Sequence, residues 1–403
     1  MRRLARMRRL WAASILPIVA PLIFAVASMA DIGYLGWRCL ESPQREGFGS
    51  EVYGIGTRTQ AALQYRLFVN RFSAECRPDV QGLVSFRGES EDVVVGSMIQ
   101  RERDPLGRPY TFYALDRPLT TAEKERIETD ADGRLLRISP VLQIPLWIEG
   151  IALAYNPPCP VTGLKLSSAA LTAVFSGVAE RWNDPLLVTD NPQLALCTSA
   201  IRVAVRSDDS AQTTVFKDYL SKRSASWKAY MTPDRNRDWP ATLLDPCRGR
   251  GDQGMVGCIA GLPGSIGYVG FAEAFRNGLP VAAVENRAGF VGPSLDECTR
   301  AAESPTGGYP ARADLDWSAT SLTDPPSGYP ICNLVFALAF EKMSPAYGGS
   351  ITVAEVRTVR DFVWTAVRAD TQRRLTRYGV APLPEFVRSL IAEPGAESIG
   401  YFE

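Results

Sequence analysis

A chain of 403 residues is long enough to bury a large core and usually folds as two lobes or domains. Lysine plus arginine equals aspartate plus glutamate at 44 each, so no basic excess indicates nucleic acid as a partner. The sequence contains no histidine, which excludes Ser-His-Asp and Cys-His catalysis, HExxH motifs and most zinc sites.

The amino-terminal segment predicts export. A cationic stretch, MRRLARMRRLW, leads into the apolar run ASILPIVAPLIFAVASMA, and small residues offer a cleavage site after Ala30. Residues 1–30 are therefore interpreted as a signal peptide or an uncleaved membrane anchor, although Pro17 and Pro21 disfavour a regular spanning helix. Residues 31–50 are expected to form a polar tether. The protein is expected to be periplasmic or at the cell surface.

Eight cysteines behind an export signal indicate disulfides rather than a metal site, since no Cys-x-x-Cys motif occurs. We expect Cys247 to pair with Cys258, because the two bracket a glycine-rich loop, and Cys159 to pair with Cys197. The alternative is that some cysteines are buried free thiols that pack as small apolar residues.

The first predicted helix follows a Gly-x-Gly segment. In YGIGTRTQAALQYRLFVNRF, Gly54 and Gly56 permit a tight turn, and Thr57 or Thr59 can cap the helix that follows. Apolar side chains then recur at helical spacing as far as Phe72.

Two further predicted strands are each followed by polar residues. Residues 82–86, GLVSF, predict a strand, and Ser90 stands before the acidic start of a helix. Residues 110–120, YTFYALDRPLT, alternate apolar residues before Asp116 and the turn at Pro118. A solvent-facing helix cap at Ser90 and an ordinary turn aspartate at Asp116 are the alternatives to ligand contacts.

Two nearly continuous apolar runs, at residues 141–156 and 331–340, predict long buried strands. Residues 304–330 are rich in Pro, Gly, Ser and Asp and predict an irregular surface connection. Amphipathic helices are expected at 353–367 and 384–391.

The segment IRVAVRSDDSAQTTVFKDYLSK, residues 201–222, predicts a strand, a polar turn and a helix with Ser210 as its N-cap. The free N–H groups of a helix N-terminus favour an anion, and Arg206 precedes them. Asp208 can hold the guanidinium in a bidentate pair while other donors remain for a ligand. The alternative is an ordinary capped helix with a surface salt bridge.

This turn resembles the anion-gripping segment of periplasmic phosphate-binding proteins, the solute receptors of phosphate ABC importers, whose pattern is Arg-x-Asp-x-Ser-Gly-Thr-Thr. The residues that keep the pattern are Arg206, Asp208, Ser210 and Thr213. Ala211 and Gln212 stand where the family usually has Gly and Thr, and Gln212 replaces a hydroxyl that normally touches the phosphate.

Other segments carry the same resemblance in the same order along the chain. Asp116 matches the acidic residue in the family phrase "SDxPLT", and Trp182 opens a WNDP motif whose role is interpreted as structural. The segment PGSIGYVGFAEA is similar to the family's "PGxIGYVEYAYA", with Gly270 where an acidic residue is usual. At the turn before Ser90, RGES replaces the usual GxGS.

The resemblance extends from about Tyr53 to Ile391 and implies an α/β fold, the two-lobed periplasmic binding protein of type II. Mixed sheets flanked by helices would form each lobe, and two crossover strands would join them. Lobe one is expected to comprise residues 51–147 and 335–395, and lobe two residues 148–334.

The resemblance also implies a function: binding of inorganic phosphate in an interlobe cleft, for delivery to the membrane permease of an ABC importer. The ligand-binding residues that it implies are Thr59 (or Thr57), Ser90, Asp116, Arg206, Asp208, Ser210, Ala211 and Gln212. Asp116 would accept a hydrogen bond from the hydroxyl group of HPO₄²⁻ and repel SO₄²⁻, which has no proton to donate. A monomer without cofactor, metal or nucleic acid is expected.

Two other classes of function remain open. The altered RGES and SAQ segments, with Glu89 and Glu91 near a helix N-terminus, favour a divergent binding module such as a sensor, scaffold or envelope protein. Ser210 as an enzyme nucleophile is the other alternative, but no activating base accompanies it.

On the sequence alone, Arg206→Ala is expected to abolish anion binding in a calorimetric titration. Thermal unfolding should change little, because a cleft arginine that faces solvent contributes little to folding.

Overall fold

A mixed eight-stranded sheet runs through the molecule in the order β2-β1-β3-β11-β4-β8-β6-β7. At one end β1, β2 and β3 are parallel, at the other end β6, β7 and β8 are parallel, and β11 and β4 between them are antiparallel to their neighbours. The strands of this sheet are β1 (Val52–Thr57), β2 (Val84–Glu89), β3 (Tyr110–Leu115), β4 (Val141–Asn156), β6 (Arg202–Arg206), β7 (Cys247–Gly249), β8 (Ser265–Gly270) and β11 (Cys332–Phe340). A small second sheet contains β5 (Lys165–Leu166), β9 (Ala283–Glu285) and β10 (Phe290–Val291).

This computed structural model describes residues 51–58, 60, 72, 84–129, 139–230 and 238–401. The predicted signal segment and tether lie outside the described residues, and so do Thr59 and most of the helix predicted after it. None of the helices in the described ranges is long and apolar enough to cross a bilayer.

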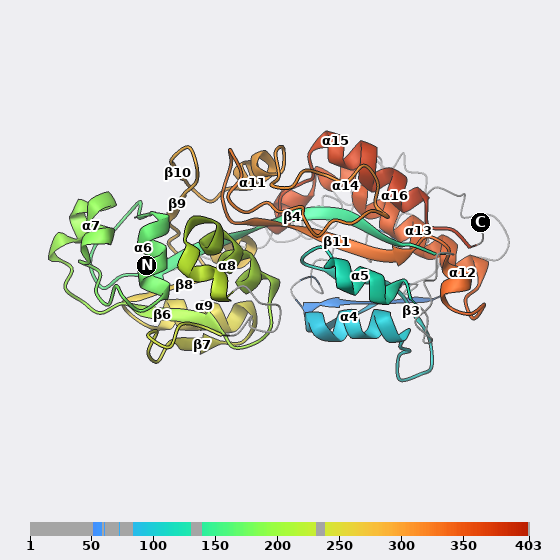
Figure 1. The fold of residues 1–403 in the computed structure, drawn as a ribbon, viewed down its shortest axis with the longest axis horizontal. Coiled ribbons are helices and arrows are strands. Elements are labelled where there is room, and N and C mark those ends of the chain that lie inside the picture. Colours follow the sequence, from blue (N-terminus) through green and yellow to red (C-terminus); the bar gives the residue numbers. More distant parts are fainter. Residues whose placement is uncertain are drawn as a thin grey trace, which may run out of the picture.

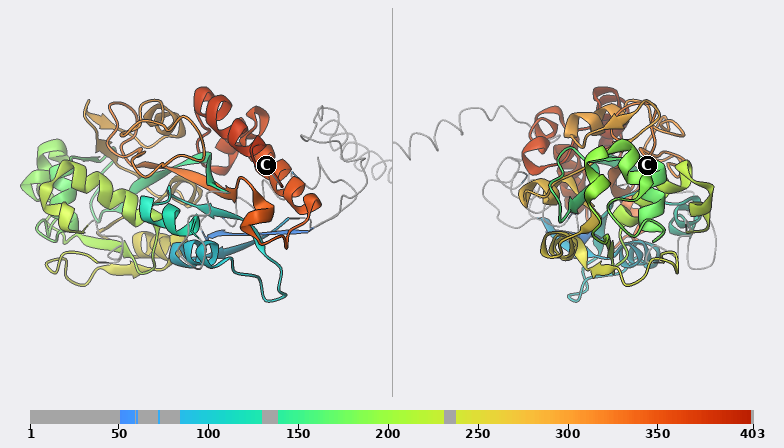
Figure 2. Two further views of the ribbon diagram at one scale, coloured as in Figure 1. Left: turned by 45° about the vertical axis from the view of Figure 1, so that its right-hand side comes forward. Right: turned by 90° about the vertical axis from the view of Figure 1, so that its left-hand side faces the viewer.

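Helices flank both ends of the sheet, with α8 and α9 beside β6–β8 and α4 and α13 beside β1 and β3 (Figures 1 and 2). The helices are α4 (Glu91–Gln100), α5 (Thr121–Ile127), α6 (Ser168–Phe175), α7 (Pro185–Asp190), α8 (Ala211–Arg223), α9 (Gly251–Gly261), α10 (Phe271–Arg276), α11 (Leu295–Ala301), α12 (Met343–Ala346), α13 (Val353–Val367), α14 (Ala369–Gln372), α15 (Glu385–Val387) and α16 (Glu393–Glu397). Short 3₁₀ turns occupy Pro192–Leu196, Ala225–Tyr230 and Leu375–Tyr378, and a π-helical turn occupies Arg388–Ala392.

The strand β4 links the two ends of the sheet, as the apolar run predicted. Its first part, as far as Gly150, pairs with β11, and its last six residues pair with β8. The register of β4 against β11 shifts beside Pro145, which has no N–H to donate to the ladder. In Figure 1, β4 and β11 run between the left and right halves of the molecule. The two crossover strands and the mixed α/β fold are therefore confirmed, whereas the residue boundaries of the lobes stay a prediction.

The expected Gly54–Gly56 turn is wrong, because both glycines lie inside β1. A Cβ at Gly54 would lie 2.1 Å from Cζ of Phe112 on the neighbouring strand, and one at Gly56 would lie 2.5 Å from Cζ of Phe86. The glycines therefore admit aromatic rings of β2 and β3 against the backbone of β1, rather than turning the chain.

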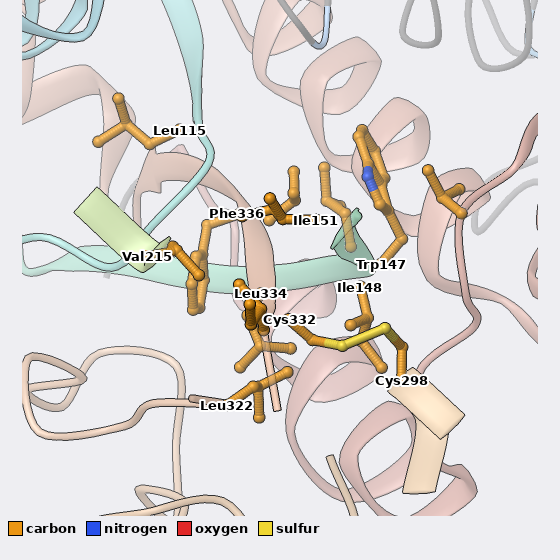
Figure 3. Packing of buried hydrophobic residues seen from close by; sticks show 14 of the residues in the cluster. Leu115, Trp147, Ile148, Ile151, Val215, Cys298, Leu322, Cys332, Leu334 and Phe336 are labelled. Carbon is orange, nitrogen blue, oxygen red and sulfur yellow. A yellow bond between two sulfur atoms is a disulfide. The ribbon is translucent and has the colours of Figure 1, made fainter. Parts of the chain in front are cut away.

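The core beside the crossover strands is apolar and carries a disulfide (Figure 3). Trp147, Ile148 and Ile151 of β4 lie near Leu334 and Phe336 of β11, and the Cys298–Cys332 disulfide ties α11 to β11. The predicted pairs Cys159–Cys197 and Cys247–Cys258 are both present, whereas the sequence analysis missed Cys298–Cys332.

Two further expectations, on Trp182 and on the segment 304–330, can be compared with the structure. Trp182 is fully buried and its Nε1 donates to the carbonyl of Gly264 at 3.1 Å, which confirms its structural role. The segment 304–330 has no helix or strand of its own, as expected, but it is more than a surface connection, because Trp317 within it is fully buried.

Gly54→Ala should lower the free energy of unfolding by about 1–3 kcal/mol, because its methyl group would overlap the buried Phe112 ring. Gly96→Ala is the matched control: its methyl group meets no atom within 4 Å on α4, so helix propensity should raise stability by about 0.5–1 kcal/mol. Denaturant unfolding of both variants measures the difference. A Gly54→Ala protein as stable as the wild type would contradict the packing described.

Candidate functional site

The two sets of parallel strands direct their carboxyl ends toward one region between the halves. On one side β1 ends at Thr57, β2 ends before Ser90, and β3 ends before Asp116. On the other side β6 ends at Arg206, and the polar turn to α8 follows. Ligands of open α/β sheets bind outside the carboxyl ends of strands, so this geometry marks the candidate site.

A cavity of about 280 Å³, a volume that includes open solvent, lies in this region. Its described lining residues are Thr57, Arg58, Glu89, Ser90, Glu91, Asp116, Arg206, Asp208, Asp209, Ser210 and Ala211. Six of the eight residues implied by the resemblance thus surround one space, although they come from segments far apart in sequence. Of the other two, Gln212 is not in the lining, and Thr59 lies outside the described residues, whereas its alternative Thr57 does line the cavity.

The Arg206 guanidinium is buried and has carboxylates on two sides. Its Nε and Nη2 donate to the two oxygens of Asp208 at 2.9 and 2.8 Å, which is the bidentate pair that the sequence predicted. Its Nη1 donates to Asp252 Oδ1 at 2.7 Å and to Gln212 Oε1 at 3.3 Å. One of the two Nη2 hydrogens is then left without a partner among these contacts, at a side chain that lines the cavity.

The pKa values of the two carboxylates that pair with Arg206 shift in opposite directions. Burial alone would lower the pKa of Arg206, but Asp208 and Asp252 raise it above its ordinary value, so the guanidinium stays charged. Burial raises the pKa of Asp208, yet hydrogen bonds from Arg206 and from the Gly251 N–H bring it below its usual range. The pKa of Asp252 is raised by burial, which outweighs the attraction of Arg206.

Two helix N-termini face the cavity. Ser210 caps α8 by accepting from the Gln212 N–H at 3.2 Å, as predicted, and Ala211 is the first residue of that helix. Ser90 is the N-cap of α4, but its side chain makes no capping hydrogen bond, which leaves its hydroxyl for the cavity that it lines. Both termini supply the partial positive charge that favours an anion.

Asp116 is the acceptor on the first side of the cavity. Its side chain is buried, and Gln60 Nε2 donates to its Oδ1 at 2.6 Å. Asn333 of β11 donates to its backbone carbonyl, so a crossover strand holds the turn that carries this carboxylate. The position predicted from "SDxPLT" is therefore a buried, oriented carboxylate rather than an exposed turn aspartate.

The acidic residues around Ser90 both line the cavity, and each has arginine partners. Glu89 accepts from Arg58 at 3.0 Å and from Arg87 at 2.8 Å. Glu91 pairs with Arg117 at 3.1 Å. Burial nevertheless raises the pKa of Glu91, and the nearby Asp116 raises it further against the effect of Arg117. The described lining holds five carboxylates and two guanidinium groups, so arginine pairing only partly offsets its negative charge.

The Gln212 side chain is buried and lies outside the described lining of the cavity. Its Oε1 accepts from Arg206, and its Nε2 donates to Glu149 Oε1 at 2.9 Å. Thr213 is also turned inward, with its hydroxyl 2.6 Å from the Tyr268 hydroxyl.

Sequence reasoning missed Asp252 and Glu149. Glu149 is the only acidic residue in the apolar strand β4, and that isolation was a signal of a special role. Asp252 lies in the first turn of α9, directly after the glycine-rich turn, where nothing local shows that it reaches Arg206.

Comparison with known proteins identifies the family. A model described as the PBP superfamily domain matches residues 81–362, which is most of the chain, so the chain belongs to that superfamily.

Several relatives are named for phosphate binding. The phosphate-binding protein PstS of Methanocaldococcus jannaschii is 31% identical over 263 residues, which cover 62% of this chain and 65% of the relative. The PstS of Haemophilus influenzae is 38% identical over 172 residues, 42% of this chain and 50% of the relative. The match therefore spans between half and two thirds of the length of these relatives.

The fold is shared with solved structures. A high affinity periplasmic phosphate-binding protein bound with phosphate superposes with a TM-score of 0.62, at 19% identity, over 87% of this chain and 99% of that one. The two-lobed architecture expected from the sequence is thus confirmed.

The buried setting of Arg206 changes the expectation for its removal. Arg206→Ala should lower the free energy of unfolding by about 3–5 kcal/mol, because it leaves the largely buried carboxylates of Asp208 and Asp252 without their cation. Arg300→Ala is the control: it breaks the exposed pair with Glu297 and should cost less than about 1 kcal/mol. Denaturant unfolding of both variants distinguishes these values, and equal small losses would contradict the account.

The loss in Arg206→Ala should also depend on pH. The folded-state pKa of Asp208 is lowered, so its stabilising contribution is present above the unfolded pKa and disappears as pH falls through the folded value. The difference in unfolding free energy between the wild type and Arg206→Ala should therefore shrink below about pH 4. A difference that stays constant from pH 7 to pH 3 would show that Asp208 is not the responsible group.

Proposed function

We propose that this protein binds inorganic phosphate in the cavity between its two halves, outside the cytoplasm, and delivers it to the permease of an ABC importer. The observation that carries the proposal is the buried Arg206 guanidinium. It is held by Asp208 near the N-terminus of α8, and it lines the same cavity as Ser90 and Asp116. Charge-assisted donors and a helix N-terminus are a recurrent combination in oxyanion sites. The PstS relatives, whose names state phosphate binding, support the same ligand.

Each lining residue has a defined part in this proposal. Arg206 donates from its remaining Nη2 hydrogen, and Ser210 and the Ala211 N–H donate from the N-terminus of α8. Ser90 donates from the opposite side, together with Thr57 or Thr59. Gln212 acts indirectly, because its side chain holds Arg206, and its N–H is used by Ser210.

Asp116 selects the ligand by its proton. A buried carboxylate accepts a hydrogen bond from the hydroxyl of HPO₄²⁻, whereas SO₄²⁻ offers only acceptors and would be repelled. The Gln60 and Asn333 contacts hold Asp116 in place for that role.

The lobes would close around the anion. Residues 51–147 and 335–395 would move as one body against residues 148–334, with β4 and β11 as the connections, and closure would present a new surface to the permease. We propose that the protein acts as an exported monomer.

An enzymatic role for Ser210 is disfavoured. Its hydroxyl caps α8 by accepting from the Gln212 N–H, which gives it a structural role, and the sequence supplies no histidine to activate it as a nucleophile. The relatives reported above are named as binding proteins.

A divergent binding module is the second candidate, and two observations favour it. The cavity lining is acidic, and a larger cavity of about 980 Å³, open to solvent, lies further along α8 at Thr214, Val215 and Asp218. A phosphorylated organic molecule would use such additional space. Binding of phosphomonoesters but not of inorganic phosphate would support this candidate.

Calorimetric titration of the full chain, freed of phosphate, with phosphate and then with sulfate tests the proposal. We expect heat from phosphate and none from sulfate. Asp116→Asn should lose about 10- to 100-fold of the preference for phosphate, because its amide can donate to sulfate and the acceptor charge is gone. Absence of a binding heat from phosphate with the wild type would refute the proposal. Unchanged selectivity between phosphate and sulfate in Asp116→Asn would refute the role of Asp116.

A further inference from the structure

Beneath the anion cavity, a chain of hydrogen bonds links Arg206 to the crossover strand β4. Arg206 Nη1 donates to Gln212 Oε1 at 3.3 Å, and Gln212 Nε2 donates to Glu149 Oε1 at 2.9 Å. The same Nη1 donates to Asp252 at 2.7 Å. An arginine at the end of β6 is thereby connected through α8 to a strand that joins the two halves of the molecule.

Gly270 provides the space that Glu149 uses. A Cβ at position 270 would lie 2.7 Å from Glu149 Oε1, which is closer than real Cβ atoms approach a neighbour, and 3.1 Å from Gln212 Nε2, which is a tight contact. Gly270 pairs with Ile151 across β8 and β4, so Glu149 lies two residues from the paired position. In the phosphate-binding pattern an acidic residue stands at 270. Here the glycine vacates that position, and a carboxyl group from the adjacent strand occupies the space.

We propose that Glu149 is a positioning residue for the anion site. Its carboxyl group occupies the space beside Gly270 and binds Gln212, which in turn holds Arg206. Gln212 and Gly270, which depart from the family pattern, and Glu149, which is the only acidic residue of β4, then form one unit. This inference rests on the proposed anion-binding function, but the contacts that carry it are within the protein.

The burial of Glu149 and the carboxylates that face it favour the neutral form of its carboxyl group. Asp116 approaches from the end of β3 and Asp252 from α9, while Arg206 of β6 is the facing cation. Gln212 of α8, Gly270 of β8 and Asn333, which pairs with Glu149 across β11, add no charge. Burial, together with Asp116 and Asp252, holds the pKa of Glu149 well above its usual range.

A neutral Glu149 has a consequence for anion binding. Its ionisation would add a third carboxylate around the Arg206 guanidinium, beside Asp208 and Asp252, and would oppose an incoming anion. Anion affinity should therefore decline as pH rises through the folded pKa of Glu149. Stability has the same sign: a raised folded pKa favours the folded state below the unfolded value and loses that benefit as pH rises.

Three variants of the full chain test the proposal in phosphate titrations. Glu149→Ala removes the acceptor for Gln212 and should weaken phosphate binding by about tenfold or more at pH 7. Gly270→Ala should weaken it too, because the methyl group displaces the carboxyl group, whereas Gly257→Ala on α9 meets no atom within 4 Å and serves as its control. Glu149→Gln keeps an acceptor but not the titrating proton, so the affinity ratio of Glu149→Gln to wild type should rise as pH increases through the folded pKa of Glu149.

A measurement without phosphate separates this inference from the proposed function. The Arg206 Nε–H resonance, assigned by its loss in Arg206→Lys, should exchange slowly with solvent in the wild type and faster in Glu149→Ala and Gly270→Ala. If the wild type binds no phosphate, the proposed function fails and the exchange rates still decide the role of Glu149. Wild-type exchange in both variants would overturn the positioning role, and so would a flat affinity ratio for Glu149→Gln if phosphate binds.

Discussion

The structure depends on a buried guanidinium group. Arg206 ends β6 with almost no exposure, and desolvating such a cation is costly unless its donors are filled. Asp208 fills two of them from the following turn, and Asp252 and Gln212 fill a third and a fourth from α9 and α8. The positions of α8 and α9 at the end of the sheet are therefore coupled to one side chain, which also supplies the charge in the cavity.

The sheet topology explains how two distant parts of the chain come to share that cavity. Each end of the sheet is a set of three parallel strands, so its carboxyl ends meet at one edge and direct their following turns there. The antiparallel strands β11 and β4 between the sets bring the two edges face to face. Asp116 on one side and Arg206 on the other are then neighbours of the same space, although 90 positions separate them in sequence.

The residues that depart from the phosphate-binding pattern are related to one another through their contacts in the structure. Gln212 replaces a ligand-facing hydroxyl, yet its side chain turns inward to join Arg206 to Glu149. Gly270 gives up an acidic side chain at the position where Glu149 needs room. The acidic RGES turn is compensated in part by Arg58 and Arg87 on Glu89. The site thus keeps the Arg206–Asp208 pair of the pattern, while residues around that pair differ from it.

The sequence by itself determined the local units. The turn after β6, with its bidentate Arg206–Asp208 pair and Ser210 cap, depends on residues within five positions of one another, and the long strands β4 and β11 follow from continuous apolar runs. Resemblance to a family then supplied the order of lobes and most of the cavity lining.

Tertiary structure decided the rest. Gly54 lies in a strand because Phe112 packs across it from β3. Asp252 reaches Arg206, and Glu149 reaches Gln212, only after non-local strands pair. Those contacts depend on strand order and register, and no local pattern encodes the neighbour that a strand will have.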